Sequence, residues 1–374
     1  MDRRHHDRGY LEIDEILGEK YIESEGVLDE SVDREGHEID ELVVAEGEEL
    51  PDHRNDTRAQ HRGHAHQKHV HPRHAHQKHA HHEHRHEMKE KYVEAIECEP
   101  FDPEPIPDFP NFGHINLIGV INCRDLGGIP TKDGRHIKKR SLLRSADLHE
   151  ATEIDIEQLK TMHGLAYVVD LRADFEVGHE PDALEHMRDI EYVNLPALSD
   201  GAIGFTGLKH LGHDLKTVTE MAHDPFQLVR ELYPKSLLGE YGMYAYSRLL
   251  HHLLENDDGA TLWHCTQGKD RTGIGAILVE YSLGVPKEYI LMDYLATNLF
   301  VKGWMEKMER TMRRNPVLRS LGLDLEAYAF ANPNYFDRAF EAVNDEYGSM
   351  DNYLLRALDF GPDKQAALRE KYLV

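Results

Sequence analysis

The segment at residues 264–273, with the sequence His-Cys-Thr-Gln-Gly-Lys-Asp-Arg-Thr-Gly, constrains the fold of this chain more than any other. The mostly apolar run Ala260–His264 before it predicts a buried strand, and the run Thr272–Leu283 after it predicts a helix. A glycine-containing turn between a strand and a helix directs backbone N–H groups and the positive helix end toward one point. The segment therefore predicts an anion-binding loop in an α/β fold.

Two side chains of this loop are suited to phosphoryl transfer. Cys265 can attack phosphorus as a thiolate, a form that the positive field of the loop stabilises. Arg271 can bind two phosphoryl oxygens with its planar guanidinium. The pattern predicts hydrolysis of phosphomonoesters through a cysteinyl-phosphate intermediate. A phosphate-binding module without catalysis remains the alternative.

The other residues of the loop have supporting roles in this interpretation. We expect His264 to orient the loop through a hydrogen bond, and the Thr272 hydroxyl to donate to the sulfur of Cys265. The residues expected to bind the substrate phosphate are Thr266, Gln267, Gly268, Lys269 and Thr272. This chemistry requires neither a cofactor nor a metal ion.

The general acid has two candidates. Asp270 lies inside the loop, where it can protonate the leaving group and then deprotonate the attacking water. Asp200 follows a predicted strand and is the best candidate on a separate loop. We favour Asp270.

Composition restricts the classes of partner. A formal net charge of −26 disfavours general binding to nucleic acids or anionic membranes. The chain has three cysteines, too few for a disulfide framework, which fits a reducing compartment. No apolar run reaches the roughly 18 residues of a membrane span, and no signal peptide is recognisable. We expect a cytoplasmic protein without stable membrane insertion, although secretion by a non-standard route would leave no trace in the sequence.

The chain divides into four regions by composition. Residues 1–60 are acidic and lack periodicity, so we expect them to be disordered. Residues 61–86 are a histidine-rich tract of low complexity, and residues 87–113 are a proline-rich linker. Residues 114–374 alternate between strand-like and helix-like patterns and form the domain that contains the loop.

The domain at 114–374 is expected to contain a central, mostly parallel sheet flanked by helices. The predicted strands are Ile115–Asn122, Ala166–Leu171, Glu191–Leu195 and Ala260–His264. The predicted helices are Glu153–Met162, Leu238–Leu254, Thr272–Leu283, Lys287–Ala296, Phe300–Arg313, Tyr335–Glu346 and Met350–Leu358. The stretch 198–237 fits no clear pattern and is interpreted as an insertion or lid.

The histidine-rich tract has two interpretations. Closely spaced imidazoles can bind divalent metal ions such as Zn²⁺, but their spacing defines no single tetrahedral site, so a solvated tail is the alternative. The candidate ligands are His61, His64, His66, His69, His71, His74, His76 and His79.

The loop resembles that of the atypical bacterial and fungal protein-tyrosine/serine phosphatases, which reads H-C-x-x-G-K-D-R-T-G. Two further segments support the resemblance, Asn-Cys-Arg-Asp-Leu-Gly-Gly at 122–128 and Leu-Leu-Arg-Ser-Ala-Asp-Leu at 142–148. A third is Asp-Leu-Arg at 170–172 with Glu176 four positions on. The resemblance covers residue 114 to the end of the chain and not residues 1–113. It implies the tyrosine-phosphatase fold.

The resemblance also bears on the acid and the substrate. In that family the aspartate before the loop arginine is the general acid, which supports Asp270. Myotubularin-like lipid phosphatases also have an aspartate there, and phosphoinositide phosphatases often have a loop lysine like Lys269. The resemblance therefore implies activity on phosphotyrosine and on phosphoserine or phosphothreonine, with phosphoinositides as the alternative.

Several residues of these segments have two interpretations. Asp170 and Arg172 either form a structural salt bridge or orient Arg271 or the loop. Arg124 and Asp125 are either a structural turn pair or supporting groups of the site. Cys123 is either a small buried apolar side chain or a partner for a protective disulfide with the loop cysteine. The amphipathic helix at 304–314 either packs in the core or serves as a lid over the site or as a lipid-facing surface.

Overall fold

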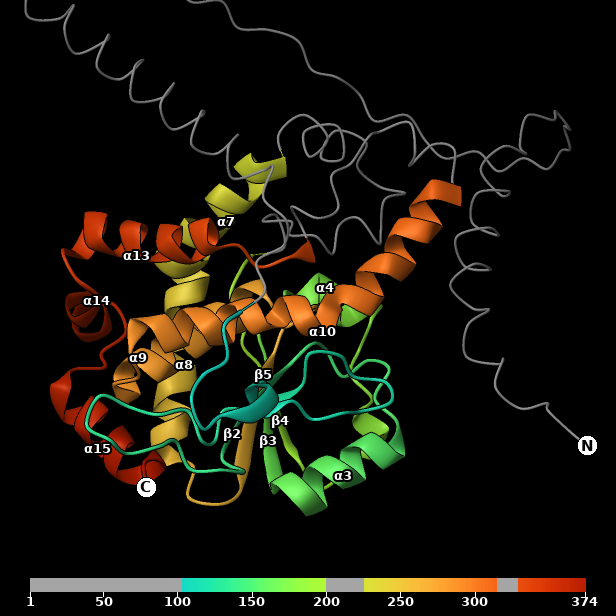
Figure 1. Cartoon of the computed structure of the whole chain (residues 1–374), viewed down its shortest axis with the longest axis horizontal. Coiled ribbons are helices and arrows are strands. Elements are labelled where there is room, and N and C mark those ends of the chain that lie inside the picture. The colour runs from blue at the N-terminus through green and yellow to red at the C-terminus, as the bar shows by residue number, and fades with distance from the viewer. Residues whose placement is uncertain (1–102, 200–224, 315–328) are drawn as a thin grey trace, which may run out of the picture. The chain divides into compact units, whose positions relative to one another are not determined.

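The computed structural model describes residues 103–199, 225–314 and 329–374. These residues form one five-stranded sheet with helices around it (Figure 1). The strand order is β1-β2-β5-β3-β4, with β1 antiparallel to β2 and every other pair parallel. The strands are β1 (Arg124–Asp125), β2 (Leu142–Ser145), β3 (Leu165–Asp170), β4 (Glu191–Asn194) and β5 (Ala260–His264). The prediction of a mostly parallel sheet flanked by helices is confirmed.

The register of the strands brings their carboxyl ends to one edge. Ser145 of β2 pairs with His264 of β5, which also pairs with Asp170 of β3. Asp170 in turn pairs with Asn194 of β4. The chain leaves four parallel strands at this edge, which is where open α/β sheets place their sites.

Most of the described residues after β4 are in helices, and two α-helices precede this strand. The α-helices are α3 (Glu153–His163), α4 (Asp174–His179), α7 (Pro225–Leu238), α8 (Glu240–Glu255), α9 (Asp270–Leu283), α10 (Lys287–Arg314), α13 (Pro333–Tyr347), α14 (Met350–Arg356) and α15 (Pro362–Tyr372). Two short 3₁₀ helices are η1 (Pro110–Gly113) and η2 (Leu184–His186). No helix among the described residues is long and apolar enough to cross a membrane.

Alternate residues of the strands enter two different cores. Val169 of β3 and Trp263 of β5 belong to the larger core, which also contains side chains of α8, α9, α10 and the C-terminal helices. Their neighbours Val168 and Leu262 belong to a smaller core with α3. In Figure 1 the helices α8, α9 and α15 accordingly lie on one side of the sheet and α3 on the other. The two-residue period of a strand buried on both faces explains this division.

The predicted strand Ile115–Asn122 is wrong, since these residues form turns and irregular structure. The backbone N–H groups of Ile118 and Gly119 donate to the two carboxylate oxygens of Asp155 on α3, at 2.6 and 2.9 Å. Asn122 has a φ of 56°, which a strand does not allow. A side chain from another element therefore takes the hydrogen bonds that a neighbouring strand would need.

The predicted helices Lys287–Ala296 and Phe300–Arg313 are one helix, α10. Thr297 and Asn298 separate the two in the sequence because both residues favour turns over helix interiors. In the structure, Asn298 forms two hydrogen bonds with the backbone of Ala331, at 2.9 and 2.6 Å. Tertiary contacts thus override a weak local preference.

The packed part of the chain begins before residue 114. Ile106, Phe109 and Phe112, which fall within the predicted linker 87–113, are buried in the larger core. Within the helix segment 304–314, Trp304 and Met305 pack in a small separate cluster, which favours the packing interpretation of that segment.

Candidate active site

The loop joins β5 to α9 at the carboxyl edge of the sheet. It runs from Cys265, directly after the last residue of β5, to Lys269, and α9 begins at Asp270. Gly268 has a φ of 68°, and a Cβ atom there would lie 2.4 Å from the carbonyl oxygen of Ser145. Only glycine allows this backbone conformation so close to β2.

Two buried side chains hold the carbonyl groups of the loop. Asn122 Nδ2 donates to the carbonyls of Gln267 and Gly268, both at 3.1 Å, and Arg144 Nη2 donates to that of Gly268 at 2.9 Å. In a planar trans peptide the N–H points away from the C=O. Fixing these carbonyls therefore fixes the directions of the Gly268 and Lys269 N–H groups. The sequence patterns contain Asn122 and Arg144 but give them no role.

A buried aspartate neutralises the positive charge of Arg144. Its Nη1 pairs with Oδ2 of Asp293 on α10 at 2.5 Å, and Arg124 donates to the carbonyl of Asp293 at 2.7 Å. Arg124 thus reaches the loop only through Asp293 and Arg144. Asp125 instead accepts the backbone N–H groups of Gly127 and Arg140, both at 2.8 Å, as a turn residue does.

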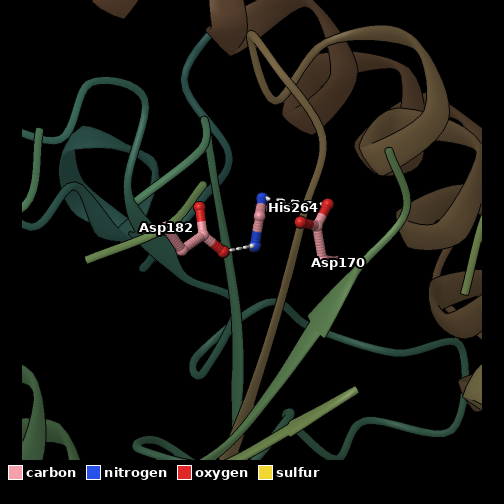
Figure 2. A group of neighbouring side chains, drawn as sticks. All are labelled: Asp170, Asp182 and His264. Carbon is pink, nitrogen blue, oxygen red and sulfur yellow. Dashed lines mark ion pairs between the residues drawn. The ribbon is translucent and has the colours of Figure 1, made fainter. Parts of the chain in front are cut away.

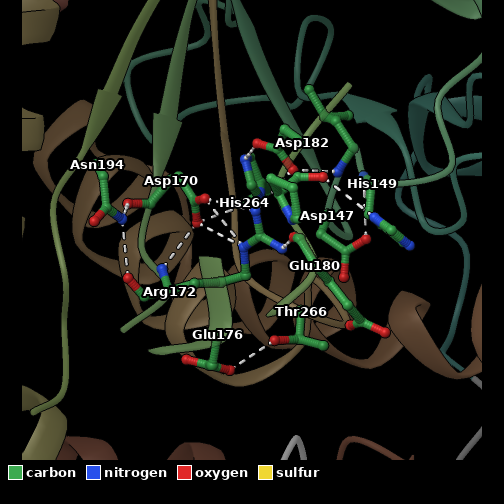
Figure 3. Close-up of polar contacts among 12 residues, drawn as sticks. Asp147, His149, Asp170, Arg172, Glu176, Glu180, Asp182, Asn194, His264 and Thr266 are labelled. Carbon is green, nitrogen blue, oxygen red and sulfur yellow. Dashed lines mark hydrogen bonds and ion pairs between the residues drawn. The ribbon is translucent and has the colours of Figure 1, made fainter. Parts of the chain in front are cut away.

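The loop arginine is bound by Glu176 of α4. Both guanidinium nitrogens of Arg271 contact the Glu176 carboxylate, with Nη2 at 2.8 Å from Oε1. Thr266 Oγ1 also donates to this carboxylate, at 2.9 Å (Figure 3). Burial alone would lower the pKa of Arg271, but the charge of Glu176 outweighs it, so the pKa is raised and the guanidinium stays charged. Glu176 belongs to a segment that resembles the phosphatase family, but its position in the sequence alone does not reveal its contact with the loop.

His264 lies between two carboxylates at the end of β5. Its Nε2 is 2.9 Å from Asp182 Oδ2, and its Nδ1 is 3.8 Å from Asp170 Oδ1 (Figure 2). Burial alone would lower the pKa of His264, but the charges of Asp182 and then Asp170 raise it to about 9. The imidazole is therefore cationic at neutral pH.

Arg172 completes this buried cluster. Its Nη2 binds Asp170 at 2.7 Å and Asp182 at 2.8 Å, and its Nη1 donates to the carbonyl of Glu180 at 2.8 Å (Figure 3). Two cations and two carboxylates balance one another. One group of potential metal ligands among the described residues has its donor atoms close enough together to bind an ion. It consists of Asp170, Asp182 and His264. Arg172 already supplies the positive charge there, so the cluster does not suit a metal.

Asp270 lies at the first position of α9, close to two tyrosines and a lysine. Tyr233 Oη donates to Asp270 Oδ1 at 2.8 Å and lies 2.6 Å from Tyr294 Oη. The buried Lys269 Nζ is 3.5 Å from the same Asp270 oxygen. The Asp270 side chain retains 18% of its exposure, so a substrate can reach it.

Some buried polar side-chain atoms of the loop have no hydrogen-bond partner among the described residues. They include Thr272 Oγ1 and Gln267 Nε2. Thr272 Oγ1 therefore retains its proton for another acceptor, as the predicted donation to sulfur requires.

The two cysteines of the described residues are both free and buried. Cys265 belongs to the larger core and Cys123 to the smaller one. Burial, only partly offset by Arg124, raises the pKa of Cys123 to about 12. These properties favour the interpretation of Cys123 as a small buried apolar side chain.

Some predicted residues lie outside the described ranges. They are the alternative acid Asp200, most of the stretch 198–237, and the histidines of the tract, His61, His64, His66, His69, His71, His74, His76 and His79.

A sheet edge with a cysteine, an arginine and an anion-binding loop between strand and helix is the site of a phosphatase. Residues 115–374 match the tyrosine phosphatase family over more than half of the chain, and the chain belongs to that family. It is 31% identical to a protein of Cupriavidus necator named as a tyrosine-protein phosphatase, over 68% of this chain and 86% of that protein.

Two further relatives have related names. A tyrosine-protein phosphatase of Nostoc commune is 27% identical over 44% of this chain and 50% of its own length. The triple specificity protein phosphatase PtpB of Mycobacterium tuberculosis is 24% identical over 64% of this chain and 91% of its own length.

Proposed function

We propose that the chain hydrolyses phosphotyrosine, and phosphoserine or phosphothreonine, in proteins through a cysteinyl-phosphate intermediate. The observation that carries this proposal is the position of Cys265 at the start of the loop whose far end presents Arg271, with both side chains at the carboxyl edge of the sheet. Family membership and the names of the relatives support a phosphatase.

In the first step, the Cys265 thiolate attacks phosphorus, a sulfur–phosphorus bond forms, and the bond between phosphorus and the leaving oxygen breaks. Asp270 donates its proton to that oxygen. Arg271 and the loop N–H groups bind the equatorial oxygens of the transferring group. Glu176 holds Arg271 in the plane that this interaction needs.

In the second step, the Asp270 carboxylate takes a proton from water, and the water oxygen attacks phosphorus. The sulfur–phosphorus bond breaks, which releases inorganic phosphate and restores the thiolate. Thr272, whose hydroxyl has no other partner in the described part of the chain, can donate to the leaving sulfur. Asp270 returns to its protonated form.

Replacement of the nucleophile tests the mechanism. In Cys265→Ser, hydrolysis of p-nitrophenyl phosphate should fall by at least about 10⁴-fold, because a serine hydroxyl is not ionised in this site. The variant should still bind vanadate or phosphate, since the loop N–H groups and Arg271 remain. Cys123→Ser is the control and should keep its turnover. Activity that survives in Cys265→Ser would exclude the cysteine mechanism.

The alternative substrate is a phosphoinositide. The buried Lys269 lies in the loop, as in phosphatases that act on these lipids, and the relative PtpB is named for triple specificity. Comparing kcat/KM for a phosphotyrosine peptide, a phosphoserine peptide and phosphoinositide vesicles will rank the three classes.

A further inference from the structure

Two tyrosine hydroxyls form a buried chain that ends on Asp270. Tyr233 of α7 and Tyr294 of α10 are both almost completely buried. Their hydroxyl oxygens lie 2.6 Å apart, and Tyr233 Oη lies 2.8 Å from Asp270 Oδ1. The two tyrosines are 61 positions apart in the sequence, so no local pattern brings these hydroxyls together.

The direction of this chain follows from the number of protons. Each hydroxyl has one proton to donate. Tyr233 donates its proton to a carboxylate oxygen of Asp270, at 2.8 Å. The proton between the two hydroxyls is therefore that of Tyr294, which donates to Tyr233 at 2.6 Å.

A hydroxyl that donates to a carboxyl group stabilises its charged form more than its protonated form. Both hydroxyls are buried, and a buried hydroxyl without a partner is costly, so the chain keeps both of them paired when Asp270 accepts as a carboxylate.

We propose that Tyr233, supported by Tyr294, is a positioning residue that holds Asp270 as an oriented carboxylate. The proposal deepens the proposed function and rests on the acid and base roles of Asp270. A carboxylate fixed in this way is ready to accept the proton of the attacking water in the second step. It also sets the pH above which the protonated acid of the first step is lost.

Other charged and titratable groups around Asp270 act on the same carboxylate. Lys269 Nζ, 3.5 Å away, also favours the charged form, and it lies 5.9 Å from the ring centre of Tyr335 of α13. Tyr246 of α8 is buried and hydrogen-bonded to Ser236 at 2.8 Å. Arg271 follows Asp270 in α9 but is paired with Glu176. None of these groups replaces the direct hydrogen bond from Tyr233.

The test is the pH profile of kcat/KM of the full-length protein with phenyl phosphate, whose leaving oxygen needs a proton. Tyr233→Phe removes one hydrogen bond to a carboxylate, so the limb that falls at high pH should move up by about one pH unit. Tyr294→Phe should move it in the same direction by less. A limb that stays at the wild-type pH in Tyr233→Phe would overturn the proposal.

A matched control separates this effect from a general loss of stability. Tyr372→Phe also removes a buried hydroxyl, which donates to the carbonyl of Leu253 at 2.8 Å, and should leave the limb in place. If Tyr233→Phe does not fold, Tyr294→Phe decides, and an unmoved limb in that variant overturns the proposal.

Asp270→Asn distinguishes failure of this proposal from failure of the proposed function. That variant should lose the high-pH limb together with most of the turnover of phenyl phosphate. If the limb and the turnover persist, Asp270 is not the acid, and the mechanism itself is wrong at this step. If they are lost in Asp270→Asn while Tyr233→Phe behaves as wild type, only the role of Tyr233 is wrong.

Discussion

Single side chains of this site are held in charged forms by buried partners of opposite sign. His264 faces Asp182 at 2.9 Å, and Arg271 is bound by Glu176 through both guanidinium nitrogens. Removing one partner of such a pair leaves an uncompensated buried charge, which is far more costly than the pair itself is stabilising. The charges at this sheet edge therefore act together and fix the orientation of the loop.

The charged state of His264 predicts how stability depends on pH. The pKa of His264 is raised from 6.5 to about 9 in the folded protein. The native state therefore binds more protons than the unfolded state between these values, and the free energy of unfolding must fall as pH rises. This contribution is fully present below pH 6.5 and lost through pH 9, by roughly 3 kcal/mol.

Most other shifted groups act outside this range of pH, but the buried Glu280 of α9, whose pKa burial raises well above 4.5, contributes a fall of the same sign. His163 and His252 have lowered pKa values because they are buried, so they release their protons below 6.5. Cys123, whose pKa is raised to about 12, contributes only above its ordinary value of 9.0. Urea unfolding of the wild type and of His264→Gln at several pH values between 6.5 and 9 measures the two slopes, and the slope of the variant should be clearly smaller. Equal slopes in the two proteins would contradict a cationic His264.

At the scale of elements, the sequence predicted best those whose run of apolar residues is long enough to show a period and ends at clear turn residues. Strand β5 has the predicted bounds Ala260–His264, and α9 begins two residues before its predicted start. The two-residue strand β1 and the six-residue helix α4 are too short to show a period. Contacts between distant segments, such as Glu176 with Arg271 or Tyr233 with Asp270, depend on the register of the sheet and on helix packing. No residue spacing encodes them.

The conformation of the loop can be tested with one methyl group. In Gly268→Ala, a Cβ atom would meet the backbone of Ser145 at 2.4 Å while φ stays at 68°. The loop must move, so we expect a loss of at least about 10²-fold in kcat/KM and about 2 kcal/mol or more in unfolding free energy. Enzyme assays and urea unfolding measure both.

Gly134→Ala is the matched control for the loop glycine. Gly134 also has a positive φ, 85°, but nothing lies within 4 Å of an added Cβ atom. This variant should lose about 1 kcal/mol to backbone strain and keep its activity. Equal kinetic effects in the two variants would show that strain, rather than contact with β2, is the cause.

At the scale of the molecule, one sheet separates two cores, and its carboxyl edge carries the site. The larger core joins the C-terminal helices to the segment before the first strand, because Ile106, Phe109 and Phe112 pack in it together with Leu126 and Leu373. Composition marks residues 103–113 as a linker since prolines and acidic residues dominate there, and only the packed structure shows that its apolar side chains are buried.

The position of this boundary predicts two truncated proteins with different stability. A chain that starts at Pro103 retains Ile106, Phe109 and Phe112, whereas a chain that starts at His114 lacks them. Removing large buried apolar side chains costs about 2–5 kcal/mol each, so losing three approaches the whole stability of about 5–15 kcal/mol of a typical domain. Thermal unfolding should show a cooperative transition for the longer chain and a large decrease in Tm, or no transition, for the shorter one. Both lack the histidine-rich tract, so the tract cannot cause the difference, and equal Tm values would place the boundary of the domain at residue 114.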